Sequence, residues 1–258
     1  MQRIEIVDTN DENIRDYGIC GYSNIRKPGY LEKLEWLKKR YTEGMKIKTL
    51  YAHEGGTQGM IEYIPGAFCW RPVDASGYMF IHCIFVGFKR EYKQKGYATI
   101  LLKECIQDAR QKNMHGVAAV TRKGPFMAGK ELFVKNGFTV ADSAAPDFEL
   151  LAMKFDEHAP SPNFKGEWET RAASYRDGLA IIRADQCPYT VKNVAEIVEA
   201  AREEYGLQPR VVDLKSHEDA QLSPSPFGTF CIVYNGEVIA HHPISRTRFV
   251  NIMKKMLP

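Results

Sequence analysis

The chain has 258 residues, of which 44% are hydrophobic, and a formal net charge of +3. This length and apolar content are enough for two packed domains. The charge is too small to predict nucleic-acid binding, and no segment approaches a membrane span, so we expect neither partner. The six cysteines lack metal-site spacing, and the N-terminus lacks an apolar signal region. These features predict free thiols, no bound metal and a location in the reducing cytoplasm.

The first part of the chain alternates strand-like and helix-like segments, which predicts a mixed α/β domain. Runs rich in β-branched and aromatic residues predict strands at 3–7, 46–52, 58–64, 79–86, 116–121, 139–141 and 148–155. Apolar spacing predicts helices at 98–110, 126–135 and 30–41, the last with Leu31, Leu34, Trp36 and Leu37 facing inward. Thr9 and Glu12 have capping-box spacing, which predicts a further short helix. The irregular segment 16–28 could shape the mouth of a substrate site.

A second α/β pattern begins after a stretch rich in proline and polar residues. We therefore expect domains at 1–157 and 171–258, joined by a linker at 158–170. Strands are expected at 179–184, 210–214, 230–234 and 237–240, and Asn235-Gly236 predicts a tight hairpin between the last two. Helices are expected from Cys187-Pro188 to Tyr205 and at 244–256.

Residues 79–110 combine a strand, a basic loop and a helix in an order that suits a phosphate group. The first-turn amides of a helix have no partner inside the helix, and the helix dipole favours negative charge there. Gly96 lets a ligand approach the backbone, and Lys93 and Lys95 add positive charge. A basic loop in front of an ordinary helix is an equally good interpretation of these properties alone.

Two motifs in this part of the chain resemble those of the GNAT superfamily of N-acetyltransferases. Lys93-Gln94-Lys95-Gly96-Tyr97-Ala98 resembles the signature R/Q-x-x-G-x-G/A, and KELFVKNGF at 130–138 resembles the family's helix, turn and strand with a Gly-Phe pair. The resemblance implies the GNAT acyltransferase fold, an α/β fold with a splayed mixed sheet. It also implies acetyl-coenzyme A as co-substrate. The amides of the loop, continuing through Thr99, would hold the pyrophosphate, and the backbone at Phe85 and Val86 would hold the pantetheine arm.

The reaction implied by this resemblance is attack of an amine on a thioester in a ternary complex. It needs a base for the amine proton and an acid for the leaving thiolate. Candidate bases are Glu62 and His82, with a solvated strand residue and a core histidine as the respective alternatives. Many GNAT enzymes use a tyrosine as the acid, but Phe133 stands at that position, so the acid is not assigned. Cys83 follows His82 directly, and adjacent strand residues point to opposite faces, so we do not expect a Cys-His couple.

The segment EYIPGAFCWR at 62–71 supplies candidates for the acceptor pocket. Tyr63, Trp70 and Arg71 could line such a pocket, and an aromatic core cluster is the alternative. The acceptor is expected to be a small-molecule or peptide amine, and a homodimer is one arrangement to consider.

The second half resembles a thioredoxin-like domain at one turn. Cys187-Pro188-Tyr189-Thr190 opens a helix, and Pro226 would be the counterpart of that fold's cis-proline. Because Thr190 replaces the second cysteine, Cys187 cannot close a disulfide within the motif. Monothiol chemistry or ligand contact at Cys187 is one alternative, and a packing or substrate-capture module is the other.

The two halves together resemble the YoaP-like acetyltransferases over nearly the whole chain. The quoted motifs are EYIPGAFCWR, IHCIFV and KNGF in the first half and CPYT and PSPFGTF in the second. We therefore expect an acetyl-coenzyme A-dependent N-acetyltransferase. A thiol-dependent redox or thiol-binding protein and a non-catalytic coenzyme A-binding regulator are the alternatives.

Overall fold

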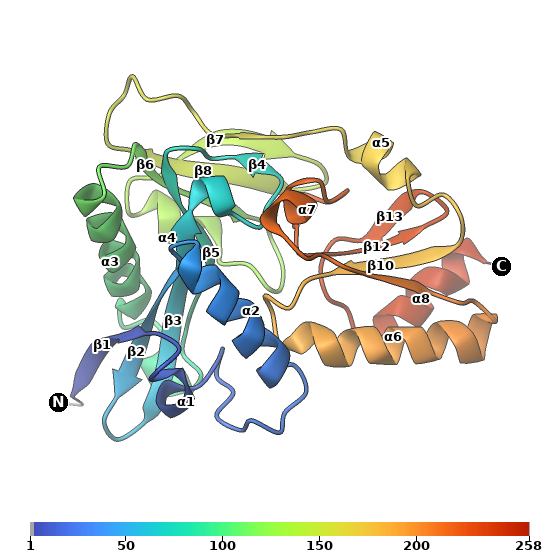
Figure 1. Ribbon diagram of the computed structural model, residues 1–258, viewed down its shortest axis with the longest axis horizontal. Helices are drawn as coiled ribbons and strands as arrows, with labels where there is room; N and C mark the ends of the chain where they lie inside the picture. The colour runs from blue at the N-terminus through green and yellow to red at the C-terminus, as the bar shows by residue number, and fades with distance from the viewer. Residues whose placement is uncertain (1–2, 258) are drawn as a thin grey trace.

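The computed structural model describes residues 3–257 and shows two sheets side by side (Figure 1). The larger sheet has seven strands in the order β1-β2-β3-β5-β6-β8-β7. Their bounds are Ile4–Thr9 for β1, Lys46–Ala52 for β2, Gly56–Pro65 for β3, Tyr78–Val86 for β5, Gly116–Thr121 for β6, Thr139–Ala144 for β7 and Phe148–Lys154 for β8. All neighbours in this sheet are antiparallel except β5 and β6, so the sheet is mixed, as expected.

The parallel pair β5 and β6 separates after a few residues. Pairing runs from Tyr78 opposite Gly116 to Ile81 opposite Ala119, but β5 continues to Val86. The unpaired length of β5 leaves the two strands splayed towards their carboxyl ends. This splay and the mixed sheet confirm the predicted fold class.

Helices cover both faces of the larger sheet. On one face, α2 (Tyr30–Thr42) packs against the sheet beside the short α1 (Ile14–Tyr17); on the other lie α3 (Tyr97–Gln111) and α4 (Lys130–Val134). Within the described residues, no helix has the length and hydrophobicity to cross a membrane.

Three local predictions for this half are wrong. Leu31 of α2 is 51% exposed, because the buried face passes through Lys33 instead. The capping box at Thr9 and Glu12 does not form; the Asn10 side chain accepts the Glu12 amide, and α1 starts only at Ile14. The helix expected at 126–135 is shortened to α4, since the segment before Gly129 is irregular.

The second sheet has four strands in the order β11-β10-β12-β13. The elements of this half are β10 (Leu179–Arg183), β11 (Arg210–Asp213), β12 (Phe230–Tyr234), β13 (Glu237–Ala240), α5 (Trp168–Ala173), α6 (Tyr189–Tyr205), α7 (His217–Gln221) and α8 (Arg246–Met256). In Figure 1, α6 and α8 lie on one side of this sheet and α5 and α7 on the other. The hairpin at Asn235-Gly236 is confirmed, with both residues at positive φ. Pro226 does not follow a cis bond as expected; the cis bond among the described residues is Ala145–Pro146.

The expected linker is held against the first half. Within it, β9 (Asn163–Phe164) pairs with β4 (Val73–Asp74), and the Lys165 amide donates to the Pro72 carbonyl oxygen. Two single-turn 3-10 helices, Gly66–Phe68 and Arg90–Tyr92, complete the element list. The linker therefore adds a short strand to the structure.

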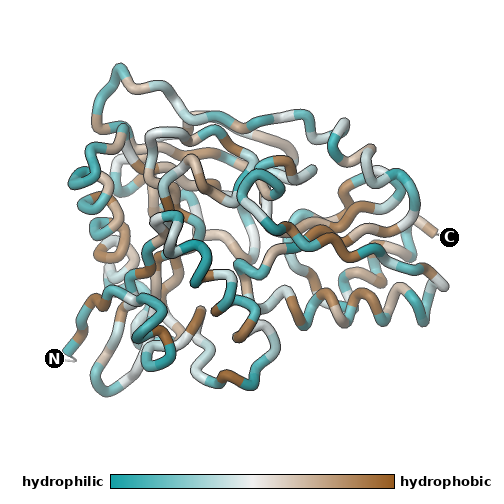
Figure 2. Tube along the Cα trace, in the orientation of Figure 1, coloured by the Kyte–Doolittle hydropathy of each residue, from teal (hydrophilic) through white to brown (hydrophobic). Residues whose placement is uncertain are grey.

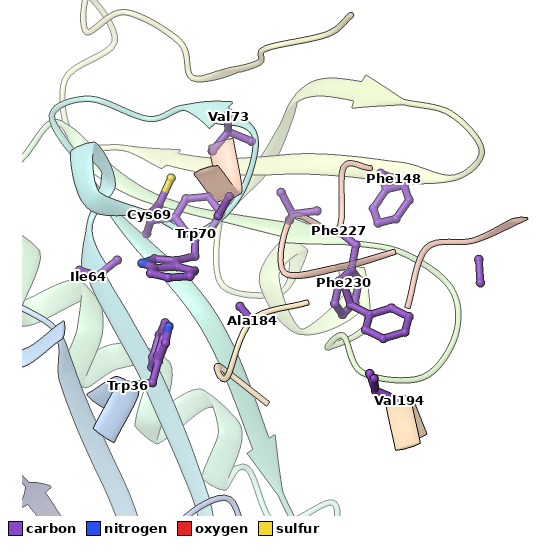
Figure 3. Packing of buried hydrophobic residues seen from close by; sticks show 14 of the residues in the cluster. Trp36, Ile64, Cys69, Trp70, Val73, Phe148, Ala184, Val194, Phe227 and Phe230 are labelled. Atoms are coloured by element: carbon purple, nitrogen blue, oxygen red, sulfur yellow. The ribbon is translucent and has the colours of Figure 1, made fainter. Parts of the chain in front are cut away.

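One hydrophobic core runs through both halves. Trp36 and Trp70 pack edge to face with ring centroids 5.1 Å apart, and the same buried cluster includes Phe227 and Phe230 of the second half (Figure 3). Figure 2 shows hydrophobic stretches along the strands of both sheets. The second half therefore docks on the α2 face of the larger sheet, beside the candidate base.

Candidate functional site

The amino end of α3 is open and unusually shaped. Gly96 caps the helix with φ +79°, a left-handed conformation that glycine adopts without steric cost, and no side chain caps the helix. Gln94 also has a positive φ of 59°. A Cβ built on Gly96 would meet nothing within 4 Å, so the backbone here can be approached directly. The exposed loop with Lys93 and Lys95 leads into first-turn amides suited to an anionic group.

The end of β5 lies between this loop and the splay. Phe85 is 42% exposed and Val86 is partly buried, and both stand beyond the last residue that pairs with β6. Tyr97, Ala98 and Thr99 form the first turn of α3 and are all partly exposed. The structure thus brings the sequence-predicted coenzyme residues together along one surface.

A buried ion pair lies on the α2 face of the sheet. The Lys33 ammonium of α2 donates to Oε2 of Glu62 on β3, and both side chains are 1% exposed. Burial alone would raise the pKa of Glu62, but Lys33 and His82 outweigh it and lower that pKa to about 2. Glu62 is therefore a buried, permanently ionised carboxylate at neutral pH, in contrast to the alternative of a solvated strand residue.

His82 on β5 lies next to this carboxylate. Its Nδ1 is 3.5 Å from Glu62 Oε1 and has no hydrogen-bond partner among the described residues. Its Nε2 accepts the Trp70 amide at 2.9 Å, which assigns the proton of the neutral ring to Nδ1. Burial lowers the pKa of His82 to about 4 despite the opposing effect of Glu62. At neutral pH this site therefore holds an anion, a cation and a neutral imidazole.

A β-bulge changes which way the neighbouring cysteine points. Glu62 is opposite Cys83 and Tyr63 is opposite Ile81, so His82 is the extra residue on β5. His82 packs near Phe80 on the α2 side, and Cys83 packs against the core cluster of that same side. The expectation that His82 and Cys83 point to opposite faces is wrong, because the bulge interrupts the strand alternation.

The second half completes the surroundings of Glu62 through Gln186. Gln186 Nε2 donates to Glu62 Oε1 at 3.1 Å, and Gln186 Oε1 accepts from Arg71 Nη1 at 3.0 Å and from Thr229 Oγ1 at 3.1 Å. Gln186 is 6% exposed. This buried network joins the two halves at the candidate base.

The other sequence-predicted residues lie apart from the splay. Tyr63 is fully buried on the α3 face, where its hydroxyl donates to Asp108 Oδ2 at 2.5 Å. Trp70 is fully buried in the shared core beside Trp36. Phe133 is buried and packs edge to face on Phe138, and its ring carries no proton donor.

Cys187 lies close to the ion pair but is not activated. It follows Gln186 and precedes α6, and its pKa is raised by burial even though the Tyr189 amide donates to it. Burial likewise raises the pKa of Cys20 and Cys83. These thiols are therefore protonated at neutral pH, a state unsuited to nucleophilic chemistry.

Sequence reasoning missed Lys33 and Gln186. Lys33 gave a usable signal, since it interrupts the apolar stripe of Tyr30, Leu34 and Leu37 at helical spacing. A charged residue on such a stripe needs a buried partner. Gln186 gave no signal, because its role depends on how the second half docks.

Comparison with known proteins gives consistent matches. The pattern of the "Acetyltransferase (GNAT) family" matches residues 9–138, and a "YoaP-like" pattern matches residues 210–251. The chain is 31% identical over 254 residues to an uncharacterized N-acetyltransferase, YoaP, of Bacillus subtilis (strain 168), covering 97% of this chain and 98% of that protein.

Two solved structures show a distant likeness. The PaiA N-acetyltransferase of Thermoplasma acidophilum, in complex with coenzyme A, is 19% identical with a TM-score of 0.42, covering 59% of this chain and 99% of that one. The GNAT family N-acetyltransferase YhbS of Escherichia coli, in complex with CoA, is 13% identical with a TM-score of 0.42, covering 64% and 91% of the two chains.

Proposed function

The chain belongs to the GNAT family of acetyltransferases and is an N-acetyltransferase, and from this premise we propose that it transfers the acetyl group of acetyl-coenzyme A to the amine of a small molecule or peptide. The observation that carries the proposal is the open, left-handed Gly96 at the amino end of α3. The free amides that follow it supply donors for a pyrophosphate without a side-chain cap to displace.

The loop and the end of β5 would share the coenzyme between them. Lys93, Gln94, Lys95, Gly96 and the first turn of α3 would hold the pyrophosphate. The backbone of β5 at residues 85–86 would hold the pantetheine arm, because this part of the strand has no β6 partner and its amides and carbonyls are available on that side.

Transfer would take place directly in a ternary complex. The acceptor nitrogen forms a bond to the acetyl carbon, the carbon–sulfur bond breaks, and coenzyme A leaves as a thiolate. Glu62 and His82 are the proposed pair that receives the amine proton, and Lys33 holds the carboxylate in place. With Phe133 in the usual tyrosine position, the thiolate leaves without a tyrosine donor, and water supplies its proton in solution.

We further propose that the halves at 1–157 and 171–258 act as one catalytic unit in the cytoplasm. Gln186 of the second half touches the proposed base, which supports a role beyond packing. The raised pKa of Cys187 disfavours the monothiol alternative.

A matched pair of glycine variants tests the coenzyme site. Gly96 and Gly206 both have positive φ and both have open space where a Cβ would project, but Gly206 caps the far end of α6. Gly96→Val should weaken coenzyme A binding by at least about tenfold, or about 1.4 kcal/mol, in titration calorimetry. Gly206→Val should bind like the wild type. Absence of coenzyme A binding by the wild type, or equal loss in both variants, would overturn the proposal.

Activity needs a separate measurement. An amine panel assayed by release of free coenzyme A thiol should give turnover with the wild type and with Cys187→Ala. Coenzyme A binding with no turnover on any amine would favour a non-catalytic regulator, and turnover lost only in Cys187→Ala would favour the thiol mechanism.

A further inference from the structure

A cavity of about 790 Å³ lies between the segment 121–131 and the hairpin residues 143–149. It is not used by the proposed coenzyme site or by the ion pair at Glu62. Thr121 at the carboxyl end of β6 lines it, two residues beyond Ala119, the last residue paired with β5. The cavity therefore adjoins the strand that borders the splay.

The charges around this cavity are balanced and paired. Arg122 and Asp147 form an ion pair at 2.8 Å, and Lys130 and Glu149 form another at 2.5 Å. Lys123 and Glu131 add one further charge of each sign to the lining. A polyanion would meet the carboxylates unpaired, and a polyamine would meet the cations unpaired, so neither suits this lining.

The cavity also offers unused hydrogen-bonding groups above an apolar floor. Thr121 is 1% exposed, and its Oγ1 has no hydrogen-bond partner among the described residues. Arg122 Nε is buried and unpartnered in the same way. Met127 and Phe148 supply apolar surface, and the Arg122 guanidinium lies 4.7 Å from the Phe148 ring centroid. Convergent polar groups on an apolar floor are typical of a ligand site, as is this volume.

We propose that this cavity binds the acetyl acceptor and that the acceptor is a short zwitterionic peptide or amino acid with an apolar side chain. The inference rests on the proposed function, which supplies the acetyl group. A carboxylate beside Arg122 and an ammonium beside Glu149 can exchange into the two ion pairs and leave no charge unmatched. The apolar side chain covers Met127 and Phe148, and Thr121 Oγ1 donates to the ligand or accepts from it.

Calorimetry without coenzyme A tests the site directly. The probe is the dipeptide leucyl-alanine, compared with its N-acetyl form and its amide, each of which lacks one of the two charges. We expect leucyl-alanine to bind and each blocked form to bind at least about tenfold more weakly. Equal binding of all three forms, or no binding of leucyl-alanine, overturns the proposal.

Three variants locate the probe. Arg122→Gln and Glu149→Gln should each weaken leucyl-alanine binding about tenfold and leave coenzyme A binding unchanged. Arg246→Gln, which breaks a comparable set of ion pairs on α8, should leave both unchanged. Thr121→Val should weaken dipeptide binding without destabilising the free protein, since it removes a buried hydroxyl that has no partner. Dipeptide affinity equal to wild type in these three cavity variants overturns the proposal.

Competition separates this site from the coenzyme site. Leucyl-alanine should bind with the same affinity when the protein is saturated with coenzyme A. If coenzyme A competes with the dipeptide, the cavity belongs to the co-substrate and the proposal falls, while the proposed function stands. Failure of coenzyme A to bind at all would overturn the proposed function, and the dipeptide titration would still judge the cavity.

Discussion

Gln186 of the second half donates a hydrogen bond to Glu62 of the first, 124 positions away along the chain, at 3.1 Å. The amide oxygen of Gln186 at the same time accepts from Arg71 and Thr229. A neutral amide thus fixes an anion on one side and a cation on the other inside a closed interface. The position of the proposed base therefore depends on the docking of both halves.

Replacing Gln186 by leucine should destabilise the protein by about 1–3 kcal/mol, because buried partners lose their hydrogen bonds. Urea unfolding measures this change. Gln107→Leu, an exposed position on α3, is the control and should stay within about 0.5 kcal/mol of the wild type. Equal unfolding free energies for the two variants would show that the interdomain bond contributes nothing.

Removing Lys33 should be more costly than removing Gln186. Lys33→Met leaves the Glu62 carboxylate buried without its cation, which should lower the free energy of unfolding by about 3–5 kcal/mol. The double variant Lys33→Met/Glu62→Gln should recover part of this loss, since no uncompensated charge remains. Lys38 pairs with Glu35 on the exposed side of the same helix, so Lys38→Met should cost less than about 1 kcal/mol. A Lys33→Met loss no larger than that of Lys38→Met contradicts the buried pair.

His82 should make the fold sensitive to mild acid. Burial lowers its pKa from the ordinary 6.5 to about 4, so between these values the unfolded chain binds a proton that the folded chain does not. Stability should therefore fall as the pH drops from about 6.5 to 4, by on the order of 3 kcal/mol from this residue. His82→Gln keeps an acceptor for the Trp70 amide but does not titrate, so its stability should fall less over the same range. His241, whose pKa burial also lowers to about 4, is present in both proteins and cancels in the comparison. Parallel pH profiles in urea unfolding would refute this assignment.

The elements of the fold could be predicted from the sequence where local pattern decides the outcome. The strands of both sheets, the left-handed turn at Gly96 and the hairpin at Asn235 depend on neighbours a few residues away. The site could be predicted only in part. Glu62 and His82 were candidates from their strands, but their partners Lys33 and Gln186 come from a helix and from the other half. Docking determines such contacts, and no local pattern encodes it.

The face to which a residue points was also beyond local pattern in two places. The bulge at His82 reverses the alternation that governs the rest of β5, and its position depends on the register with β3. Pro226 was assigned by motif order, whereas Thr229, directly before β12, is the residue that reaches Gln186. Both errors come from counting along the chain without knowing the pairing in space.

Separation of the halves should expose the shared core. A fragment of residues 1–157 would lose the packing of Trp70 and Phe148 against Phe227 and Phe230, which belong to the same buried cluster. We expect it to bind a dye for exposed apolar surface, to show weak near-ultraviolet circular dichroism and to lack a cooperative urea transition. Adding the fragment 158–258 is the control and should restore all three properties, because it supplies the missing face. A fragment 1–157 that unfolds as cooperatively as the full chain would show that the first half has a sufficient core of its own, and the dependence of the proposed base on docking would then rest on Gln186 alone.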